Sequence, residues 1–518
     1  MNGAELLSQT LLLNGVDVCF ANPGTSEMHF VAALDRTPQL RCILGLAETV
    51  VTGAADGYGR MAEKPAATLL HLGPGLANGL SNLHNARRAA TPLLNIVGDH
   101  ASYHLAADAP LTSDIDSLAW PVSAWVGRVE NPNDVADRTV EALTATRDGA
   151  AGQVATMVLP ADSAWGLADR NDAPLVCSPA VAKPPSVDRV GDACDLLRGR
   201  DRVAILLGGD AVRAPHMEVA SRIANATGAS LFSEHVSRRI ECGAGRVAPI
   251  RVPYSVDDAV AAFSRFSAVI LIGADEPVAF FAYPGKPSTF LPDGCDVIKV
   301  ATPSEDALIA LTMIADEIGL GDSCASLMPL ELPDVPYGAI TAETLGAAVA
   351  RALPEGAIVC NEAITGGGPF IHYAQRARPH DLLGLTGGAI GCGIPLSIGA
   401  AIACPNRKVV NLQADGSGFY ALQGLWTQAR ERLDIVTVIL ANRRYGILRH
   451  ELASVGAGKP GLNASRMLDI DDPAPDWVKL ALGMGVDAVR VDSAEELADV
   501  FSNSMSRPGP FLIEALMP

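Results

Sequence analysis

The 518-residue sequence lacks any uninterrupted apolar run close to the about 20 residues of a membrane-spanning helix, although 49% of its residues are hydrophobic. We therefore expect a soluble globular protein with no membrane partner. No basic region follows Met1, so we expect no signal peptide. The 10 cysteines include no Cys-x-x-Cys pair and lie in apolar surroundings, as expected for reduced core thiols of a cytoplasmic protein.

The chain also lacks a cluster of basic residues. Its 39 lysines and arginines are outnumbered by 58 acidic residues, which gives a formal net charge of −19. Binding of nucleic acid requires a basic surface that neutralises phosphates, so we expect no nucleic-acid partner. The acidic balance bears on solubility rather than on the substrate.

Two proline-rich stretches divide the chain into three blocks. The stretches contain Pro174, Pro179, Pro184 and Pro185, and then Pro329, Pro333 and Pro336. Each block alternates strand-like and helix-like segments, which predicts three α/β domains. We place these domains at residues 1–180, 186–328 and 337–518.

The first and third blocks begin alike. Helix-like residues 5–14 precede strand-like residues 16–20, and residues 344–353 precede residues 357–360 in the same order. We interpret the two blocks as distant structural copies, although helix followed by strand is a common order.

Polar side chains follow two apolar segments of the third block. Asp415 follows residues 408–413, and Asn442 follows residues 434–441. Residues 418–430, which lie between them, carry apolar side chains at helical spacing, so the order predicts a parallel βαβ unit. Both side chains would then reach the carboxyl edge of the sheet, where open α/β folds bind ligands. Their oxygens would suit Mg²⁺, and a plain Asp-Gly turn is the alternative.

Residues 414–442 resemble the diphosphate-binding signature of thiamine-diphosphate (ThDP) enzymes, in which Asp-Gly-Ser is followed by Asn after one βαβ unit. The family usually has Gly and Asn where this chain has Ala414 and Ala441. The resemblance implies that Asp415, Asn442 and the backbone carbonyl of Arg444 bind Mg²⁺. It also assigns to cofactor binding Gly416, Ser417, Tyr445 and Gly446.

Glu48 is the only charged residue in the apolar segment 42–55. A lone carboxylate there is costly unless it is paired or protonated. A glutamate that starts a helix near solvent is the alternative interpretation. Residues 52–60 resemble the same family, and the resemblance implies that Glu48 shares a proton with the pyrimidine ring of ThDP and so activates the cofactor.

Three further segments of the first block end in polar residues. Residues 20–27 run from a strand into a Pro-Gly turn and resemble the amino-terminal loop of benzoylformate decarboxylases and acetolactate synthases, so Thr25 and Ser26 would present hydroxyls to the substrate carboxylate. Ordinary turn chemistry is the alternative. His71 matches an active-site histidine of benzoylformate decarboxylases and would relay protons, unless it is a structural histidine. His100 is a second candidate of the same kind.

A glycine-rich segment of the third block, residues 385–391, resembles the loop against which ThDP folds. Gly388 would offer its carbonyl to the pyrimidine amine, and Ile390 would hold the cofactor in its bent shape. A glycine-rich turn before a helix is the alternative. Glu362 and Thr365 follow a strand expected at the same sheet edge, and we assign them to the diphosphate or pyrimidine side of the cofactor.

The resemblance spans nearly the whole chain, from Asn22 to Leu516, and is strongest to the benzoylformate decarboxylase and acetolactate synthase branch. It implies pyrimidine-binding, central and diphosphate-binding domains, each a doubly wound and mostly parallel sheet. It also implies that a 2-oxo acid is decarboxylated, after which the enamine is protonated or ligated to a second carbonyl. The assembly implied is a homodimer at minimum and a homotetramer as the expected form, with Glu48 and Asp415 meeting across an interface.

The middle block departs from the family pattern. It lacks the Gly-Met-His-Gly and Arg-Phe-Asp-Asp-Arg segments typical of FAD-containing acetolactate synthases, so FAD is doubtful. Residues 277–285 stand where a second active-site histidine is expected, and they form either a substrate-pocket wall or a core strand and turn. An FAD-containing synthase or oxidase of this fold, and a non-catalytic ThDP-fold binding protein, are the alternative functions.

Overall fold

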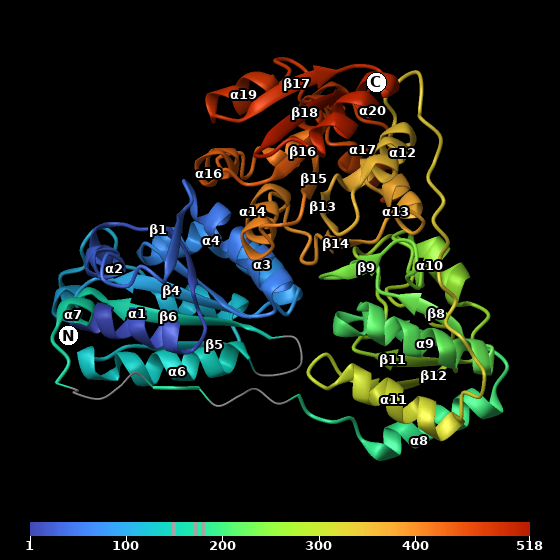
Figure 1. Cartoon of the computed structure of the whole chain (residues 1–518), viewed down its shortest axis with the longest axis horizontal. Coiled ribbons are helices and arrows are strands. Elements are labelled where there is room, and N and C mark those ends of the chain that lie inside the picture. Colours follow the sequence, from blue (N-terminus) through green and yellow to red (C-terminus); the bar gives the residue numbers. More distant parts are fainter. Residues whose placement is uncertain (148–151, 170–174, 178–181) are drawn as a thin grey trace.

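The computed structural model describes residues 1–147, 152–169, 175–177 and 182–518. These residues form three β-sheets with their helices, seen as the blue, green and orange-red regions of Figure 1. The predicted linker residues Pro174 and Pro179 lie outside the described ranges, and the domain boundaries stay predictions. Every helix in the described ranges falls short of the length and apolarity needed to cross a membrane.

The first sheet, built from described residues only, has six parallel strands in the order β2-β1-β3-β4-β6-β5. All residues of β4 and β6 are buried, as expected for central strands covered on both faces. The strands are β1 (Val18–Asn22), β2 (Arg41–Leu44), β3 (Ala66–Leu70), β4 (Leu93–Asp99), β5 (Trp125–Arg128) and β6 (Val154–Pro160). The helices are α1 (Gly3–Leu13), α2 (Met28–Leu34), α3 (Glu48–Ala62), α4 (Leu72–Arg88), α5 (Ile115–Ala119), α6 (Val135–Thr146) and α7 (Ala161–Trp165).

The second sheet has five parallel strands among the described residues, in the order β10-β8-β7-β11-β12. The strands are β7 (Val203–Leu207), β8 (Ser230–Ser233), β10 (Ile250–Arg251), β11 (Ala268–Ile272) and β12 (Asp296–Ala301). The helices are α8 (Val187–Gly199), α9 (Ala214–Thr227), α10 (Val256–Phe263) and α11 (Ala307–Ile318).

The third sheet has the order β17-β18-β16-β15-β13-β14-β9, in which only β9 is antiparallel to its neighbour within the described ranges. The strands are β9 (Ile240–Cys242), β13 (Ala357–Glu362), β14 (His380–Gly384), β15 (Val409–Ala414), β16 (Ile435–Ala441), β17 (Asp487–Val491) and β18 (Phe511–Leu516). The helices are α12 (Ala342–Ala352), α13 (Gly368–Ala374), α14 (Gly393–Ala403), α15 (Asp415–Gly418), α16 (Gly424–Glu431), α17 (Gly446–Ser454), α18 (Leu462–Leu468), α19 (Trp477–Gly483) and α20 (Ala494–Ser504). The predicted fold class, three α/β units with mostly parallel sheets, is confirmed.

The first and third sheets are structural copies. Numbered from the first strand of each unit, the six parallel strands of both sheets follow the order 2-1-3-4-6-5. The predicted helix and strand pairs at the two starts are α1 with β1 and α12 with β13.

The segment between β15 and β16 differs from the prediction. The expected helix over residues 418–430 is broken into α15 and α16, and the glycines Gly418 and Gly424 bound the interruption because glycine is a poor helix former.

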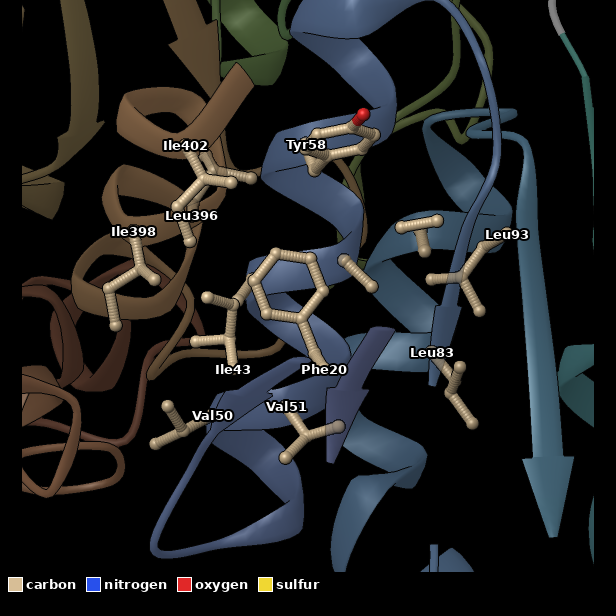
Figure 2. Close-up of a cluster of buried hydrophobic side chains, with 14 of the residues drawn as sticks. Phe20, Ile43, Val50, Val51, Tyr58, Leu83, Leu93, Leu396, Ile398 and Ile402 are labelled. Carbon is tan, nitrogen blue, oxygen red and sulfur yellow. The ribbon is translucent and has the colours of Figure 1, made fainter. Parts of the chain in front are cut away.

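The first and third units of the chain share a hydrophobic core at the crossing of α3 and α14. Figure 2 shows Leu396 and Ile398 of the third unit on one side of α3 and Leu83 of the first unit on the other, and all three are buried. The two helix backbones touch, because a Cβ added at Gly399 would lie 1.9 Å from the Ala54 carbonyl oxygen. This packing holds the carboxyl edges of the two copied sheets in a defined relation.

Candidate active site

Glu48 is the first residue of α3, beyond the carboxyl end of β2. Its side chain is half-buried, and Asn78 Nδ2 on α4 donates a hydrogen bond to Glu48 Oε2 at 3.2 Å. Gly75 leaves space beside it, since a Cβ added there would lie 3.3 Å from Oε1. The apolar segment 42–55 led us to expect a more deeply buried carboxylate. Glu48 is only half-buried in the single chain, because the first turn of α3 lies at the carboxyl edge of the sheet. Its role in activating ThDP stays a prediction.

A glutamate–histidine pair lies at the ends of the neighbouring strands β1 and β3. Glu27 is buried, and its Oε2 lies 2.8 Å from His71 Nδ1 and accepts the Gly24 N–H at 2.7 Å. Burial raises the pKa of Glu27, while the Gly24 N–H and His71 oppose that rise. The pair can therefore hold a proton between a carboxyl and an imidazole at the sheet edge.

Two glycines make room for this pair. A Cβ added at Gly24 would lie 2.3 Å from the His71 ring, and one added at Gly98 would lie 1.7 Å from Glu27 Oε1. The same Oε1 is buried and has no hydrogen-bond partner among the described residues. The packing of three strand ends thus fixes both side chains.

The other predicted residues of the first unit lie around this pair. Thr25 and Ser26 open the short 3₁₀-helix η1 (Thr25–Glu27), with Thr25 exposed and Ser26 half-buried. His100 follows β4, and its Nε2 is buried without a hydrogen-bond partner in the described part of the chain. Its ring centroid lies 5.4 Å from that of His104. The predicted roles of Thr25, Ser26 and His100 toward the substrate stay predictions.

Asp415 is buried at the carboxyl end of β15. Its Oδ1 accepts the Gly416 N–H at 2.8 Å, and its Oδ2 accepts the Arg443 N–H at 2.6 Å. Burial raises the pKa of Asp415 although these N–H groups oppose the rise. Asn442, after β16, accepts the Arg444 N–H on Oδ1 at 3.1 Å. The predicted strands therefore place the acid and the amide at neighbouring strand ends.

These oxygens fit a hard cation. Each carboxylate oxygen of Asp415 that accepts one N–H keeps lone-pair capacity, and a cation would offset the cost of its burial. In the described ranges, no group of three or more His, Cys, Asp or Glu side chains is arranged to hold a metal. A cation here would rely on Asp415, Asn442 and the Arg444 carbonyl, which accepts the Gly446 N–H at 3.0 Å. Remaining positions would suit water and phosphate oxygens, as is usual for Mg²⁺.

Small and aromatic residues surround this acid and amide. A Cβ added at Gly416 would lie 2.6 Å from Tyr445 Cε1, and one added at Gly446 would lie 3.3 Å from Thr365 Oγ1. Thr365 belongs to the 3₁₀-helix η6 (Ile364–Gly366), which follows β13. Ser417 is buried, and its hydroxyl donates to the Ala414 carbonyl at 3.2 Å. The structure thus gathers all of these predicted residues, whose contact with a cofactor stays a prediction.

The glycine-rich loop 387–391 lies between the third sheet and α4. Gly388 has a positive φ of 76°, which favours glycine, and Ile390 is half-buried beside it. Glu362 is fully buried, and its carboxylate oxygens accept the N–H groups of Gly391 and Gly393, both at 2.5 Å. Burial raises the pKa of Glu362, and these two N–H groups oppose the rise. Glu362 therefore holds the loop, and its assignment to the diphosphate or pyrimidine side of the cofactor stays a prediction.

The aromatic segment 277–285 of the second unit reaches this loop. A Cβ added at Gly388 would lie 2.7 Å from Phe280 Cζ, and Tyr283 donates a hydrogen bond to Glu451 on α17 at 2.8 Å. Phe280 also lines a cavity of about 180 Å³ at the carboxyl edge of the second sheet, beside Glu234 and Tyr254. The alternative of a core strand and turn is wrong, because this fully described segment contains only an isolated bridge at Val278 and its Val278, Phe280 and Phe281 are exposed. The substrate-pocket wall stays a prediction.

Comparison with known proteins decides the family. The model for thiamine pyrophosphate enzymes, N-terminal TPP binding domain, matches residues 1–119, and the model for the C-terminal TPP binding domain matches residues 365–515. The chain belongs to the thiamine-diphosphate-dependent enzymes. Glu48 and His71 lie in the first match, and Gly388, Asp415 and Asn442 lie in the second.

Relatives of this ThDP-dependent enzyme span its whole length. A Mycobacterium tuberculosis protein named as an acetolactate synthase large subunit, IlvX, is 49% identical over 100% of this chain and 99% of its own. Benzoylformate decarboxylase of Pseudomonas aeruginosa is 27% identical, covering 98% and 97%. The fold matches that of the ThDP-dependent 4-hydroxybenzoylformate decarboxylase of Rhodococcus jostii with a TM-score of 0.87, at 24% identity over 100% and 99% of the two chains. The enzyme is therefore of the acetolactate synthase and benzoylformate decarboxylase type.

Sequence reasoning missed Glu27 and the polar residues of α4. Glu27 ends the segment 20–27, and its signal would have been the presence of an acid and of His71 after two successive strands of the sheet. Asn78, His84 and Asn85 on α4 contact Glu48 or the loop 387–391. An Asn-rich helix face was the only local signal for them, and the partner of Asn85, Ala389, lies 304 positions away in the sequence.

Proposed function

We propose that this ThDP-dependent enzyme uses Mg²⁺ and decarboxylates a small 2-oxo acid. One observation carries the proposal: Glu48 stands at the carboxyl edge of the first sheet, while Asp415 and Asn442 stand at that of its structural copy. When bound, ThDP supplies a carbon nucleophile and an electron sink for decarboxylation. The residues of the chain bind, orient and exchange protons around it.

Asp415, Asn442 and the Arg444 carbonyl hold the Mg²⁺ that accompanies the diphosphate. Gly388 and Ile390 support the cofactor from the loop 387–391, whose backbone is already held by buried side chains. Glu48 would present its carboxylate to the pyrimidine and would share a proton with it. The half-buried position of Glu48 and the buried position of Asp415 support this division of roles.

After decarboxylation, the first outcome that we propose is protonation of the decarboxylated substrate, which releases an aldehyde. The pairing of His71 with buried Glu27 at 2.8 Å supports it, because the pair can retain and deliver a proton at the sheet edge. Thr25 and Ser26, beside the pair, would bind the substrate carboxylate through their hydroxyls.

The second outcome that we propose is ligation of the decarboxylated substrate to another carbonyl compound, which gives an acyloin or a 2-hydroxy-3-oxo acid. The aromatic segment 277–285 supports it, because Phe280 beside Gly388 can exclude water from a second, apolar reactant. The name of the 49% identical relative, an acetolactate synthase large subunit, points the same way.

We further propose a homodimer at minimum, and a homotetramer as its expected form, in which Glu48 of one subunit serves the cofactor anchored by Asp415 of the other. In one chain, Glu48 bonds to Asn78, and Asp415 bonds to the backbone of its own loop. A closed two-fold assembly would then contain two identical sites.

The test combines purified protein, ThDP and Mg²⁺ with pyruvate, 2-oxobutyrate, and branched and aromatic 2-oxo acids. NMR would score aldehyde against acyloin products, and EDTA should abolish turnover until Mg²⁺ is restored. Absence of product from every 2-oxo acid, together with no acceleration of C2–H exchange of ThDP in deuterated water, would overturn the proposal. Yellow purified protein would instead support a flavin-containing enzyme.

A further inference from the structure

Helix α4 holds the cofactor loop of its own chain through buried amides. Asn85 Nδ2 donates to the Ala389 carbonyl at 2.8 Å, and Asn85 Oδ1 accepts the Ala389 N–H at 3.2 Å. Asn85 is completely buried, and Ala389 is half-buried. A single side chain thereby satisfies both backbone groups of one loop residue, much as a neighbouring strand would.

The same helix face contacts the rest of the loop. His84 Nε2 lies 3.1 Å from the Gly387 carbonyl oxygen, and Asn82 Nδ2 donates to the Gly391 carbonyl at 3.4 Å. The fit requires glycine, because a Cβ added at Gly387 would lie 2.4 Å from Asn85 Oδ1. With Glu362 on its other side, the loop is held from the third sheet and from the first unit at once.

An earlier turn of α4 contacts a different residue, Glu48. Asn78 donates to Glu48, and it precedes Asn85 by about 10 Å along the helix at about 1.5 Å per residue. In the proposed assembly, Glu48 acts on the cofactor anchored by the partner subunit. The loop 387–391 acts on the cofactor anchored by Asp415 of its own chain. One helix therefore touches two different active sites.

We infer that Asn85, with Asn82 and His84, is a positioning residue for the active site anchored by Asp415 of its own chain, although it shares a domain with Glu48. The inference rests on the proposed function and its shared sites. Removal of the Asn85 amide leaves the Ala389 N–H and carbonyl without partners, and buried unpaired groups are costly. The loop should then open locally and hold ThDP poorly.

The first test needs no substrate. Hydrogen–deuterium exchange of the apoprotein should show amides 386–391 exchanging roughly 10-fold faster or more in Asn85→Ala, and calorimetry should show ThDP with Mg²⁺ binding roughly 10- to 100-fold more weakly. Asn95→Ala is the matched control, because Asn95 is an equally buried amide paired with Thr68 and Thr156 inside the first sheet. Unchanged loop exchange in Asn85→Ala, or equal effects of both variants, would overturn the positioning role.

The second test assigns the site by complementation. Two differently tagged variants are co-expressed, mixed assemblies are purified through both tags, and C2–H exchange of bound ThDP counts the competent sites. Asn85→Ala mixed with Glu48→Gln should restore about half of the wild-type sites. Asn85→Ala mixed with Asp415→Ala should restore none, because both lesions fall on sites anchored by their own chains.

The opposite complementation pattern would overturn the inference, since it would place Asn85 with Glu48. The mixture of Glu48→Gln with Asp415→Ala is the control for the proposed function, and it should restore about half of the sites. If only that control fails, the shared site is refuted. The hydrogen–deuterium exchange of amides 386–391 then decides alone whether Asn85 positions the loop.

Discussion

Glu27→Gln is expected to slow the proton-transfer step at His71 while preserving the fold. The substitution keeps the size of the side chain, and an amide oxygen can still accept the Gly24 N–H. It removes the negative charge that lies 2.8 Å from His71 Nδ1. A protonated His71 would then lose a charge-assisted hydrogen bond and keep at most a neutral one.

The magnitude follows from that exchange of bonds. A hydrogen bond to a charged group contributes about 1.5–3 kcal/mol and a neutral one about 0.5–1.5 kcal/mol, so the protonated pair is destabilised by about 1–2 kcal/mol. The rate of a step that depends on it should fall by roughly 5- to 30-fold. Stability should not fall at high pH, because burial raises the pKa of Glu27, so the fold disfavours the ionised carboxylate, and neutral glutamine lacks that cost.

The assay compares kcat and KM with the best 2-oxo acid for wild type and three variants. Gly98→Ala should resemble Glu27→Gln, because its methyl group would lie 1.7 Å from Glu27 Oε1 and displace the carboxylate. Glu130→Gln, a change at an exposed glutamate of the same unit, should match wild type. A folded Glu27→Gln enzyme with kcat within a factor of about two of wild type would refute the role of the pair.

Three further substitutions test other parts of the structure. Glu48→Gln should bind ThDP and keep its oligomeric state in light scattering, but lose at least about 100-fold in turnover; substantial residual activity would contradict its role. Burial, with Asp275 nearby, raises the pKa of Glu234 from 4.5 to about 7, so the folded state holds a proton that the unfolded state releases and stability falls as pH rises through that window. Glu234→Gln should therefore be about 1–3 kcal/mol more stable than wild type in urea at pH 8 and equal to it at pH 4.5, and equality at pH 8 would disprove this. Gly399→Ala should lower the free energy of unfolding by about 1–3 kcal/mol, because its Cβ would lie 1.9 Å from the Ala54 carbonyl oxygen. Gly191→Ala is its control: no atom lies within 4 Å of the added Cβ, so stability should stay equal or rise by up to about 1 kcal/mol.

The positions of Asp415 and Asn442 could be predicted from local sequence. Each follows an apolar run of strand length, and a parallel βαβ unit necessarily places both side chains at one sheet edge. The start of α3 at Glu48 and the strand before His71 follow from local pattern in the same way. The helix over residues 418–430 was a local error, where two glycines outweighed the apolar spacing, and so was the core strand given as one alternative for residues 277–285.

The residues that the sequence did not reveal act across strands and domains. Glu27 and His71 are 44 positions apart, and they meet because β1 and β3 are neighbours in the sheet. Asn85 and Ala389 are 304 positions apart, and they meet because of how the first unit packs on the third. No local periodicity encodes either distance.

The sequence by itself therefore determined the family, the strand ends and the polar groups presented there, because these depend on chain direction and side-chain type over short segments. The tertiary structure alone decided that Glu27 and His71 lie within hydrogen-bond distance and that α4 holds the loop 387–391. The physical reason is that both outcomes depend on strand order and on the close α3–α14 crossing, where glycines such as Gly399 allow two backbones to touch.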